Sequence, residues 1–408
     1  MHRVAVTGIG VLSPIGNGVE SFWDATLQGR VGVGPLTRFD AGGYPSRIAA
    51  QIDDFDPTDY MEPKRARRTD RFAQFAVAAA RDALDDAGFH PNGNHHDVGV
   101  YIGSALGGVA YADEQHDVFR ARGLGAVKPL LAISVFGGAA TCNVALEFDL
   151  RGPSVANANS CASGAVAIGE AFRAVARGDV RAALAGGVEA PLSPLAFGAF
   201  TVIHAMSTRN DDPGHASRPF DRERDGFVMA EGAGVLVLER MEDALGRGAR
   251  VYGEIAGYGC SNDAHHMSAP RPDGTSAAHA MSVALAEAVL APDEIEAIDA
   301  HGSSTPLGDR CETIALRCAF GERLDRTPVL ATKGQHGHAL GATGAWEAAV
   351  SLLAIERGML PRVVGLIVDD PECALHFVRE TSARRVRTVL SNSAGFGGLN
   401  AALVFKAV

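Results

Sequence analysis

Short apolar runs alternate with longer amphipathic segments along the chain. The clearest helix is predicted over residues 71–87, where apolar side chains recur every three or four positions until Gly88. The apolar run at 98–102 (VGVYI) predicts a buried strand. Further strands are predicted at 4–6, 152–159, 182–188 and 235–238, and a further helix at 165–177. Such alternation is typical of an α/β fold with buried sheets.

The second half of the chain repeats this order of elements. Strands are predicted at 251–258, 295–300, 329–332, 388–391 and 401–405, and helices at 276–290, 311–320 and 341–357. The similar order in the two halves indicates an internal duplication, with the join near residues 246–250. We therefore predict an N-terminal half, residues 1–250, and a C-terminal half, residues 251–408.

The composition is that of a folded globular protein. The chain has 408 residues, of which 47% are hydrophobic and 21% charged, which excludes a disordered chain, a coiled coil and a collagen-like repeat. The net charge of −11 argues against nucleic acid as a partner, because phosphate binding requires a basic face. We expect no signal peptide, because the N-terminal apolar run is short and soon broken by glycine and proline, and no run of about 18 apolar residues predicts a membrane helix. We expect a cytoplasmic protein.

The six cysteines are scattered, and no CxxC pair occurs. This spacing predicts neither a disulfide framework nor a zinc site, and it favours a reducing compartment.

Cys161 is the most distinctive candidate residue. It follows a predicted strand, lies in a turn of small residues (SCASG) and begins a predicted helix. A nucleophile in such a turn is expected to expose its sulfur above the positive end of the helix, and both effects favour the thiolate. A buried structural cysteine is the alternative.

His301 and His338 each follow a predicted strand and have glycine neighbours, so each could project into a site. One cysteine with two histidines could accept an acyl group and then stabilise an oxyanion or an enolate. Ordinary loop histidines are the alternative. His336 and His338 form an HxH pair without a nearby carboxylate or cysteine, so we expect no metal site. The glycine-rich run at 392–398 could point backbone N–H groups at a ligand oxygen.

A basic cluster stands out in this acidic chain: Lys64, Arg65, Arg67, Arg68 and Arg71. It is either a solvated face or a docking site for an anionic partner.

Six segments, taken together in order and spacing, resemble the β-ketoacyl-acyl carrier protein synthases of the thiolase superfamily, and most of all the elongating class II enzymes. They are VAVTGIGVLSPIGNG, NSCASG, STRNDDPGHASRPFDRERDGFVMAEGAGVLVLE, AHGSSTPLGDRCE, TKGQHGHALGATGAWE and NSAGFGGLN. The resemblance covers nearly the whole chain.

The resemblance implies a thiolase-like fold of two similar α/β halves packed as five layers, α-β-α-β-α. It implies that Cys161 takes an acyl chain from the phosphopantetheine thioester of an acyl carrier protein. Malonyl-carrier protein then loses CO2, and its enolate attacks the Cys161 thioester to give a 3-oxoacyl chain two carbons longer. No bound cofactor is implied. The partners implied are the carrier protein and a second subunit, either another copy or a chain-length-factor-like protein.

The resemblance also implies roles for the site residues. His301 and His338 would assist decarboxylation and hold the enolate, beside a buried ion pair of Lys333 and Glu347. The N–H groups of Cys161 and Phe396 would form the oxyanion hole, and the Phe396 ring would gate the acyl pocket. Further matches are Ser303 and Thr305 (pantetheine arm), Leu106 (pocket wall), Lys64, Arg67 and Arg68 (carrier docking), and Asp263, Asp309 and Glu312 (structural).

Several residues depart from those usual in the family: Asn159, Ser160, His204, Gln335, His336, Ala394 and Leu399. They flank the pocket and the docking face and leave the nucleophile untouched. They favour a specialised polyketide or polyene pathway slightly over fatty acid synthesis, and both stay open. The alternatives are a non-condensing acyltransferase, a ketosynthase active only with a chain-length-factor partner, and a non-catalytic subunit.

Overall fold

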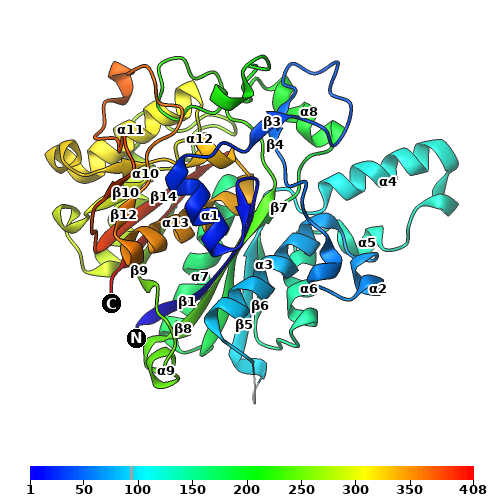
Figure 1. The fold of residues 1–408 in the computed structure, drawn as a ribbon, viewed down its shortest axis with the longest axis horizontal. Helices are drawn as coiled ribbons and strands as arrows, with labels where there is room; N and C mark the ends of the chain where they lie inside the picture. The colour runs from blue at the N-terminus through cyan, green and yellow to red at the C-terminus, as the bar shows by residue number, and fades with distance from the viewer. Residues whose placement is uncertain (92–94) are drawn as a thin grey trace.

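A computed structural model describes residues 1–91 and 95–408 (Figure 1). Its described residues form one sheet of eleven strands in the order β11-β10-β14-β15-β9-β1-β8-β7-β5-β6, with β2 paired to β1. The strands are β1 (Val4–Ser13), β2 (Gly16–Asn17), β5 (Val98–Gly103), β6 (Ser154–Asn157), β7 (Ala182–Glu189), β8 (Gly232–Arg240), β9 (Gly253–Asn262), β10 (Ala297–Asp299), β11 (Val329–Leu330), β14 (Thr388–Gly395) and β15 (Leu399–Lys406). Two small two-stranded sheets pair β3 (Val33–Pro35) with β4 (Ile48–Ala50) and β12 (Met359–Leu360) with β13 (Ser382–Ala383).

The strand order is symmetric about the centre of the sheet. There β1 and β9 pair antiparallel. Outward from β1, the pairs β1–β8 and β8–β7 are antiparallel, and β7–β5 and β5–β6 are parallel. Outward from β9, the pairs β9–β15 and β15–β14 are antiparallel, and β14–β10 and β10–β11 are parallel. The order of strand directions is the same on both sides of the centre. The molecule is therefore built from two similar halves.

Helices form three layers around these strands (Figure 1). Between the halves lie α7 (Ser163–Arg177) and α13 (Thr343–Arg357), which contact each other and strands of the sheet and are buried along most of their length. Outside lie α3 (Arg71–Ala87) and α6 (Ala139–Glu147) on one half, and α10 (Thr275–Ala288) and α11 (Pro306–Phe320) on the other. These are the five layers that the resemblance implied: each half contributes one strand layer, and the pairing of β1 with β9 makes the two strand layers one continuous sheet.

Glycine in the central strands permits the same close helix contact in both halves. A Cβ on Gly10 of β1 would lie 1.9 Å from the Ala79 carbonyl oxygen of α3. A Cβ on Gly259 of β9 would lie 2.0 Å from the Ala280 carbonyl oxygen of α10. No real Cβ sits so close to an oxygen, so both helices pack directly on strand backbone.

The helix predicted over 71–87 coincides with α3, but several other helices were not predicted: α1 (Val19–Gln28), α2 (Pro63–Ala66), α4 (Val109–Arg122), α5 (Leu131–Ser134), α6, α8 (Pro194–Val202), α9 (Met241–Gly246) and α12 (Lys333–His336). The longest of these, α4, is mostly exposed and so has no apolar stripe for the pattern to detect. None of the described helices is long and apolar enough to cross a membrane. All six cysteines are free thiols.

Candidate active site

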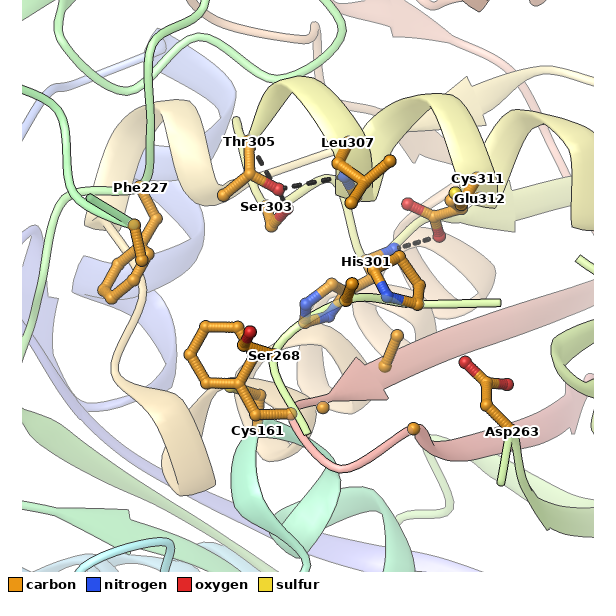
Figure 2. Close-up of a pocket in the computed structure, with 18 of the residues that line it drawn as sticks. Cys161, Phe227, Asp263, Ser268, His301, Ser303, Thr305, Leu307, Cys311 and Glu312 are labelled. Carbon is orange, nitrogen blue, oxygen red and sulfur yellow. Dashed lines mark hydrogen bonds between the residues drawn. The ribbon is translucent and has the colours of Figure 1, made fainter. Parts of the chain in front are cut away.

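A cavity of about 390 Å³ lies where the two halves meet, and Cys161, His301, His338 and Phe396 all line it. Figure 2 shows Cys161 at its floor, His301 above, and Ser303 and Thr305 at the far end. The structure thus brings together side chains that are up to 235 positions apart in the chain (396 − 161 = 235).

Cys161 lies in a single helical turn, Ser160–Ala162, between β6 and α7. Ser160 has φ 53°, a left-handed conformation that turns the chain sharply into the helix. Gly395 packs against this turn, since a Cβ there would lie 3.0 Å from the Cys161 nitrogen. The C-terminal glycine-rich run is therefore seated directly on the cysteine backbone.

The expectation that the Cys161 sulfur is exposed and favours the thiolate is wrong. The residue is only 7% exposed, and burial raises the pKa of its thiol to about 11. The Ser160 hydroxyl, the positive charge of Lys333 and the Phe396 N–H all lower that pKa, but less than burial raises it. Desolvation dominates because the residue is almost completely buried.

Lys333 determines the tautomer of His301. The Lys333 ammonium is fully buried, and it donates to Glu347 and to the His301 carbonyl oxygen. It also lies 3.3 Å from His301 Nδ1. An ammonium can only donate, so Nδ1 must accept and the proton of the neutral ring belongs on Nε2. His301 thereby becomes a hydrogen-bond donor at Nε2.

His338 is held from two sides. Its Nδ1 lies 3.0 Å from the hydroxyl of Thr343, in the first turn of α13. The Phe227 ring meets it edge-on with centroids 5.4 Å apart, and the His301 ring does so at 5.3 Å. Burial, and then the charge of Lys333, lower the pKa of both His301 and His338 well below 6.5. Both rings are therefore neutral at pH 7.

The three carboxylates interpreted as structural all hold loops around the cavity. Glu312 accepts from the N–H groups of His301 and Gly302 at 2.7 and 2.8 Å. Asp309 accepts from the Ser304 N–H and the Ser303 hydroxyl at 3.0 and 3.1 Å. Asp263 accepts from the Asn400 amide and the Arg271 N–H, at 2.8 Å each.

The remaining predicted pocket residues lie at different depths. Thr305 caps α11, and its hydroxyl lies 2.8 Å from that of Ser303 at the cavity wall. The Phe396 ring stacks on Phe200 with centroids 6.2 Å apart. Leu106 packs in a hydrophobic cluster with Cys161 but does not line the open cavity.

The basic cluster divides into two groups. Arg65 pairs with Glu147 at 2.7 Å, and Arg71 pairs with Glu231 at 3.0 Å. Lys64, Arg67 and Arg68, at and just after α2, are exposed and do not line the cavity. Within the part of the chain that the structure describes, none of these three forms an ion pair.

The residues that depart from the family pattern also separate. His204 and Ala394 line the cavity. His336 is buried, hydrogen-bonded to the Gly337 carbonyl and the Thr332 hydroxyl, and packed on Trp346 with centroids 4.9 Å apart. His336 is thus a packed core histidine, and burial lowers its pKa to about 3.

Two residues next to His338 were missed from the sequence, Phe227 and Thr343. Phe227 lies within a segment that carries the family resemblance, but its contact with His338 is a long-range one. Thr343 follows His338 by five residues, on the first turn of the predicted helix, and a search for hydrogen-bonding side chains near each histidine could have found it.

Comparisons with known proteins agree with the resemblance in the motifs. The family model of the β-ketoacyl synthase N-terminal domain matches residues 1–244, and that of the C-terminal domain matches residues 252–366. A Synechocystis protein named 3-oxoacyl-acyl-carrier-protein synthase 2 is 42% identical over 406 residues, 99% of this chain and 98% of the relative.

Solved structures give the same result. The ishigamide ketosynthase/chain length factor matches with a TM-score of 0.94 and 34% identity, over 100% of this chain and 99% of that one. A type II PKS acyl-carrier protein in complex with its ketosynthase bound to the hexaketide matches with a TM-score of 0.91 and 32% identity, over 100% and 99%.

The raised pKa of Cys161 predicts a steep pH dependence of its reactivity. Alkylation by iodoacetamide should accelerate about tenfold per pH unit from pH 7 to 10 without levelling off, because only the thiolate reacts. Mass spectrometry of the Cys161 peptide measures the rate, with N-acetylcysteine as a thiol of ordinary pKa. A plateau below pH 9 would contradict the raised pKa.

Substitutions in the buried Lys333–Glu347 ion pair should change the stability of the protein and the reactivity of Cys161 independently. Lys333→Met should lower the free energy of unfolding by about 3–5 kcal/mol, because it leaves the Glu347 carboxylate buried without a cation. Adding Glu347→Leu should restore most of that loss, yet Cys161 alkylation at pH 8 should stay slower than in the unaltered protein.

Urea denaturation measures the stability of both variants. The exposed pair Arg317 and Asp325 is the matched control, since replacing both should change stability by less than about 1 kcal/mol. Equal alkylation rates in the double variant and the unaltered protein would show that the ammonium does not assist Cys161.

Proposed function

The chain belongs to the β-ketoacyl synthase family and is an acyltransferase of the 3-oxoacyl-acyl-carrier-protein synthase type, and we propose that Cys161, His301 and His338 carry out its chemistry. One observation carries the assignment of residues: a buried cysteine from one half and two neutral histidines from the other face a single cavity.

The first step is acyl transfer to Cys161. Its sulfur attacks the carbonyl carbon of the acyl-carrier thioester, a new C–S bond forms, and the old C–S bond breaks. The carrier leaves as a thiol with the proton that Cys161 gives up. The Cys161 and Phe396 N–H groups stabilise the oxyanion of the tetrahedral intermediate, and the Phe396 N–H already contacts the sulfur in the free enzyme.

The second step is decarboxylation of malonyl-carrier protein in the same cavity. The bond from Cα to the carboxylate breaks, CO2 leaves, and the electron pair forms a thioester enolate. His301 donates from Nε2 to the enolate oxygen, because its Nδ1 faces the Lys333 ammonium. In this proposal the Thr343 hydroxyl donates to Nδ1 of His338, which leaves the proton of that ring on Nε2, beside the enolate. Neutral donors suit this step because they stabilise the enolate without protonating its carbon.

In the third step the enolate carbon attacks the carbonyl of the Cys161 thioester. A C–C bond forms, the C–S bond breaks, and a 3-oxoacyl-carrier two carbons longer is released. Cys161 then takes one proton from solvent. The overall reaction consumes one proton and releases one CO2 and one free carrier thiol.

The carrier protein and its arm contact the enzyme at two places in this proposal. Ser303 and Thr305 hold the pantetheine arm at the cavity wall. Lys64, Arg67 and Arg68 attract the acidic carrier, and their exposure without ion-pair partners among the described residues supports this role. A related ketosynthase has been solved with its acyl-carrier protein.

A second subunit is supported by the surface around β6. This strand is the last of its sheet, and its backbone edge is unpaired within the described residues. Exposed apolar side chains gather on it and on the segments that precede it in the chain: Ile133, Phe136, Leu146 and Val155. An apolar sheet edge of this kind is typical of an association surface. A copy of this chain or a chain-length-factor-like protein would cover it.

We also propose that the chain divides into residues 1–250, which carry the nucleophile, and residues 251–408, which carry the two histidines, and that the enzyme acts in the cytoplasm.

Intact-mass analysis of the enzyme with acyl- and malonyl-carrier protein, beside Cys161→Ala, tests the proposed function. We expect an acyl adduct that depends on Cys161, then CO2 and a 3-oxoacyl carrier two carbons longer. An adduct without an extended product would favour the non-condensing acyltransferase. A product that appears only when a second, different subunit is added would establish the heterodimer. Condensation by Cys161→Ala would refute the catalytic assignment.

Reversing the charge of the docking group should affect only carrier-bound substrates. In the triple variant Lys64→Glu, Arg67→Glu and Arg68→Glu we expect the KM for acyl-carrier protein to rise about tenfold or more at low salt. The difference from the unaltered enzyme should shrink above about 0.5 M salt, because salt screens exposed charges. Reaction with a small-molecule thioester should be nearly unchanged.

The control is a charge-matched variant on another surface, in which Arg384, Arg385 and Arg387, all exposed, become Glu. It changes net charge by the same amount, so an equal rise in KM there would show that only the overall charge matters.

A further inference from the structure

Glu189 is a buried carboxylate that none of these chemical steps uses. It ends β7 and is fully buried, with 0% of its surface exposed. Its two oxygens accept four hydrogen bonds: from the Ser104 hydroxyl (2.9 Å) and from the N–H groups of Ala105 (2.7 Å), Leu106 (3.1 Å) and Gly341 (3.0 Å). Within residues 1–91 and 95–408 it forms no ion pair. Burial raises the pKa of Glu189 to about 7, and these backbone and hydroxyl donors oppose that rise.

These four donors come from two segments that are far apart in the chain. Three belong to the loop that follows β5, and Ser104 extends the link by accepting from the Gly107 N–H at 2.9 Å. The fourth belongs to the single helical turn Leu340–Ala342, which leads from His338 into α13. One carboxylate thus joins a loop of the N-terminal half to a turn of the C-terminal half.

Both tethered segments contribute a leucine to the hydrophobic cluster that contains Cys161. Leu106 and Leu340 pack in the same hydrophobic cluster as Cys161, together with Phe197 and Leu192. An acyl chain bound to the Cys161 sulfur must enter apolar surroundings, and this cluster is the apolar environment of that cysteine. Leu106 and Leu340 are among the side chains that such a chain would meet.

The turn at Leu340 has an unfavourable backbone conformation and close neighbours. Leu340 has φ 43°, a left-handed conformation that a branched side chain rarely adopts. Gly341 is closely surrounded, since a Cβ there would lie 2.7 Å from the Ala105 nitrogen and 2.8 Å from Glu189 Oε2. The hydrogen bond from the Gly341 N–H to Glu189 holds the turn in this conformation.

A carboxylate suits this position because it only accepts hydrogen bonds. Four donors face it, and two ionised oxygens can accept all of them. The amide of a glutamine would present its NH2 group to at least one backbone N–H, so one tethered segment would have to move.

We propose that Glu189 is a positioning residue that sets the spacing of Leu106 and Leu340 beside Cys161 and thereby selects the length of the acyl chain. This inference rests on the proposed function, in which Cys161 carries that chain. Releasing either segment widens or tilts the apolar wall. The discrimination between acyl chains then changes, while the decarboxylating histidines keep their own contacts with Lys333 and Thr343.

The test compares kcat/KM for acyl-carrier proteins of 4, 8, 12 and 16 carbons in the unaltered enzyme and in Glu189→Gln. We expect the ratio of kcat/KM between the best and the worst acyl chain to change by about tenfold, because a shift of the apolar wall alters how well each chain fits. Malonyl decarboxylation by enzyme without an acyl group should change less than about threefold. Glu239→Gln is the matched control, since Glu239 is a buried carboxylate on β8 that binds Thr7 and Arg247 away from the cavity.

Thermal unfolding identifies which variants fold. If Glu189→Gln does not fold, the same comparison of chain lengths is made with Glu189→Asp, which keeps the carboxylate but is one methylene too short to reach both segments. If neither folds, Ser104→Ala decides, because it removes one donor and leaves the carboxylate in place. A uniform loss of activity across all chain lengths, or the same change of ratio in Glu239→Gln, would overturn the proposal. Absence of condensation in the unaltered enzyme would instead refute the proposed function.

Discussion

The buried ammonium of Lys333 is the interaction on which the site depends. It lies without solvent contact between the Glu347 carboxylate and the backbone and ring of His301. From that position it determines which nitrogen of His301 carries the proton, helps to keep the imidazoles of His301 and His338 neutral and lowers the pKa of Cys161 against the effect of burial. A surface cation would be screened by water and could do none of these at the same distance.

Such a site forms because two similar halves meet with very little space between them. The turn that carries Cys161, Ser160–Ala162, and its counterpart, Leu340–Ala342, both lead into a central helix and both contain a left-handed residue. They pack so closely that a Cβ on Gly164 would lie 2.7 Å from the Gly341 carbonyl oxygen. The middle residue of the turn is Cys161 in one half and Gly341 in the other. The glycine leaves room for the loop that the other half contributes.

Buried carboxylates do the positioning in this molecule. Glu312 and Asp309 accept backbone N–H groups from the loop that carries His301 and Ser303, and Glu189 accepts them from the loop after β5 and the turn before α13. Those loops follow strands and have few partners in the sheet, so their N–H groups would otherwise be left without acceptors. A carboxylate at the end of a strand, or in the first two turns of a helix, provides acceptors for these N–H groups. Burial raises the pKa of each of these acids, and their hydrogen bonds oppose that rise.

The sequence by itself determined the α/β class, the two similar halves, the helix at 71–87 and the set of candidate residues, because periodicity and motif spacing are local properties of the chain. Glycines inside β1 concealed most of that strand, since they are read as breaks when the helix packed on them is not known. The burial of Cys161, the tautomer of His301 and the contacts of Phe227, Thr343 and Glu189 were decided only by the tertiary structure. A pKa depends on desolvation and on charges brought close by folding, and a hydrogen bond depends on which distant segments meet. Neither can be read from neighbours along the chain.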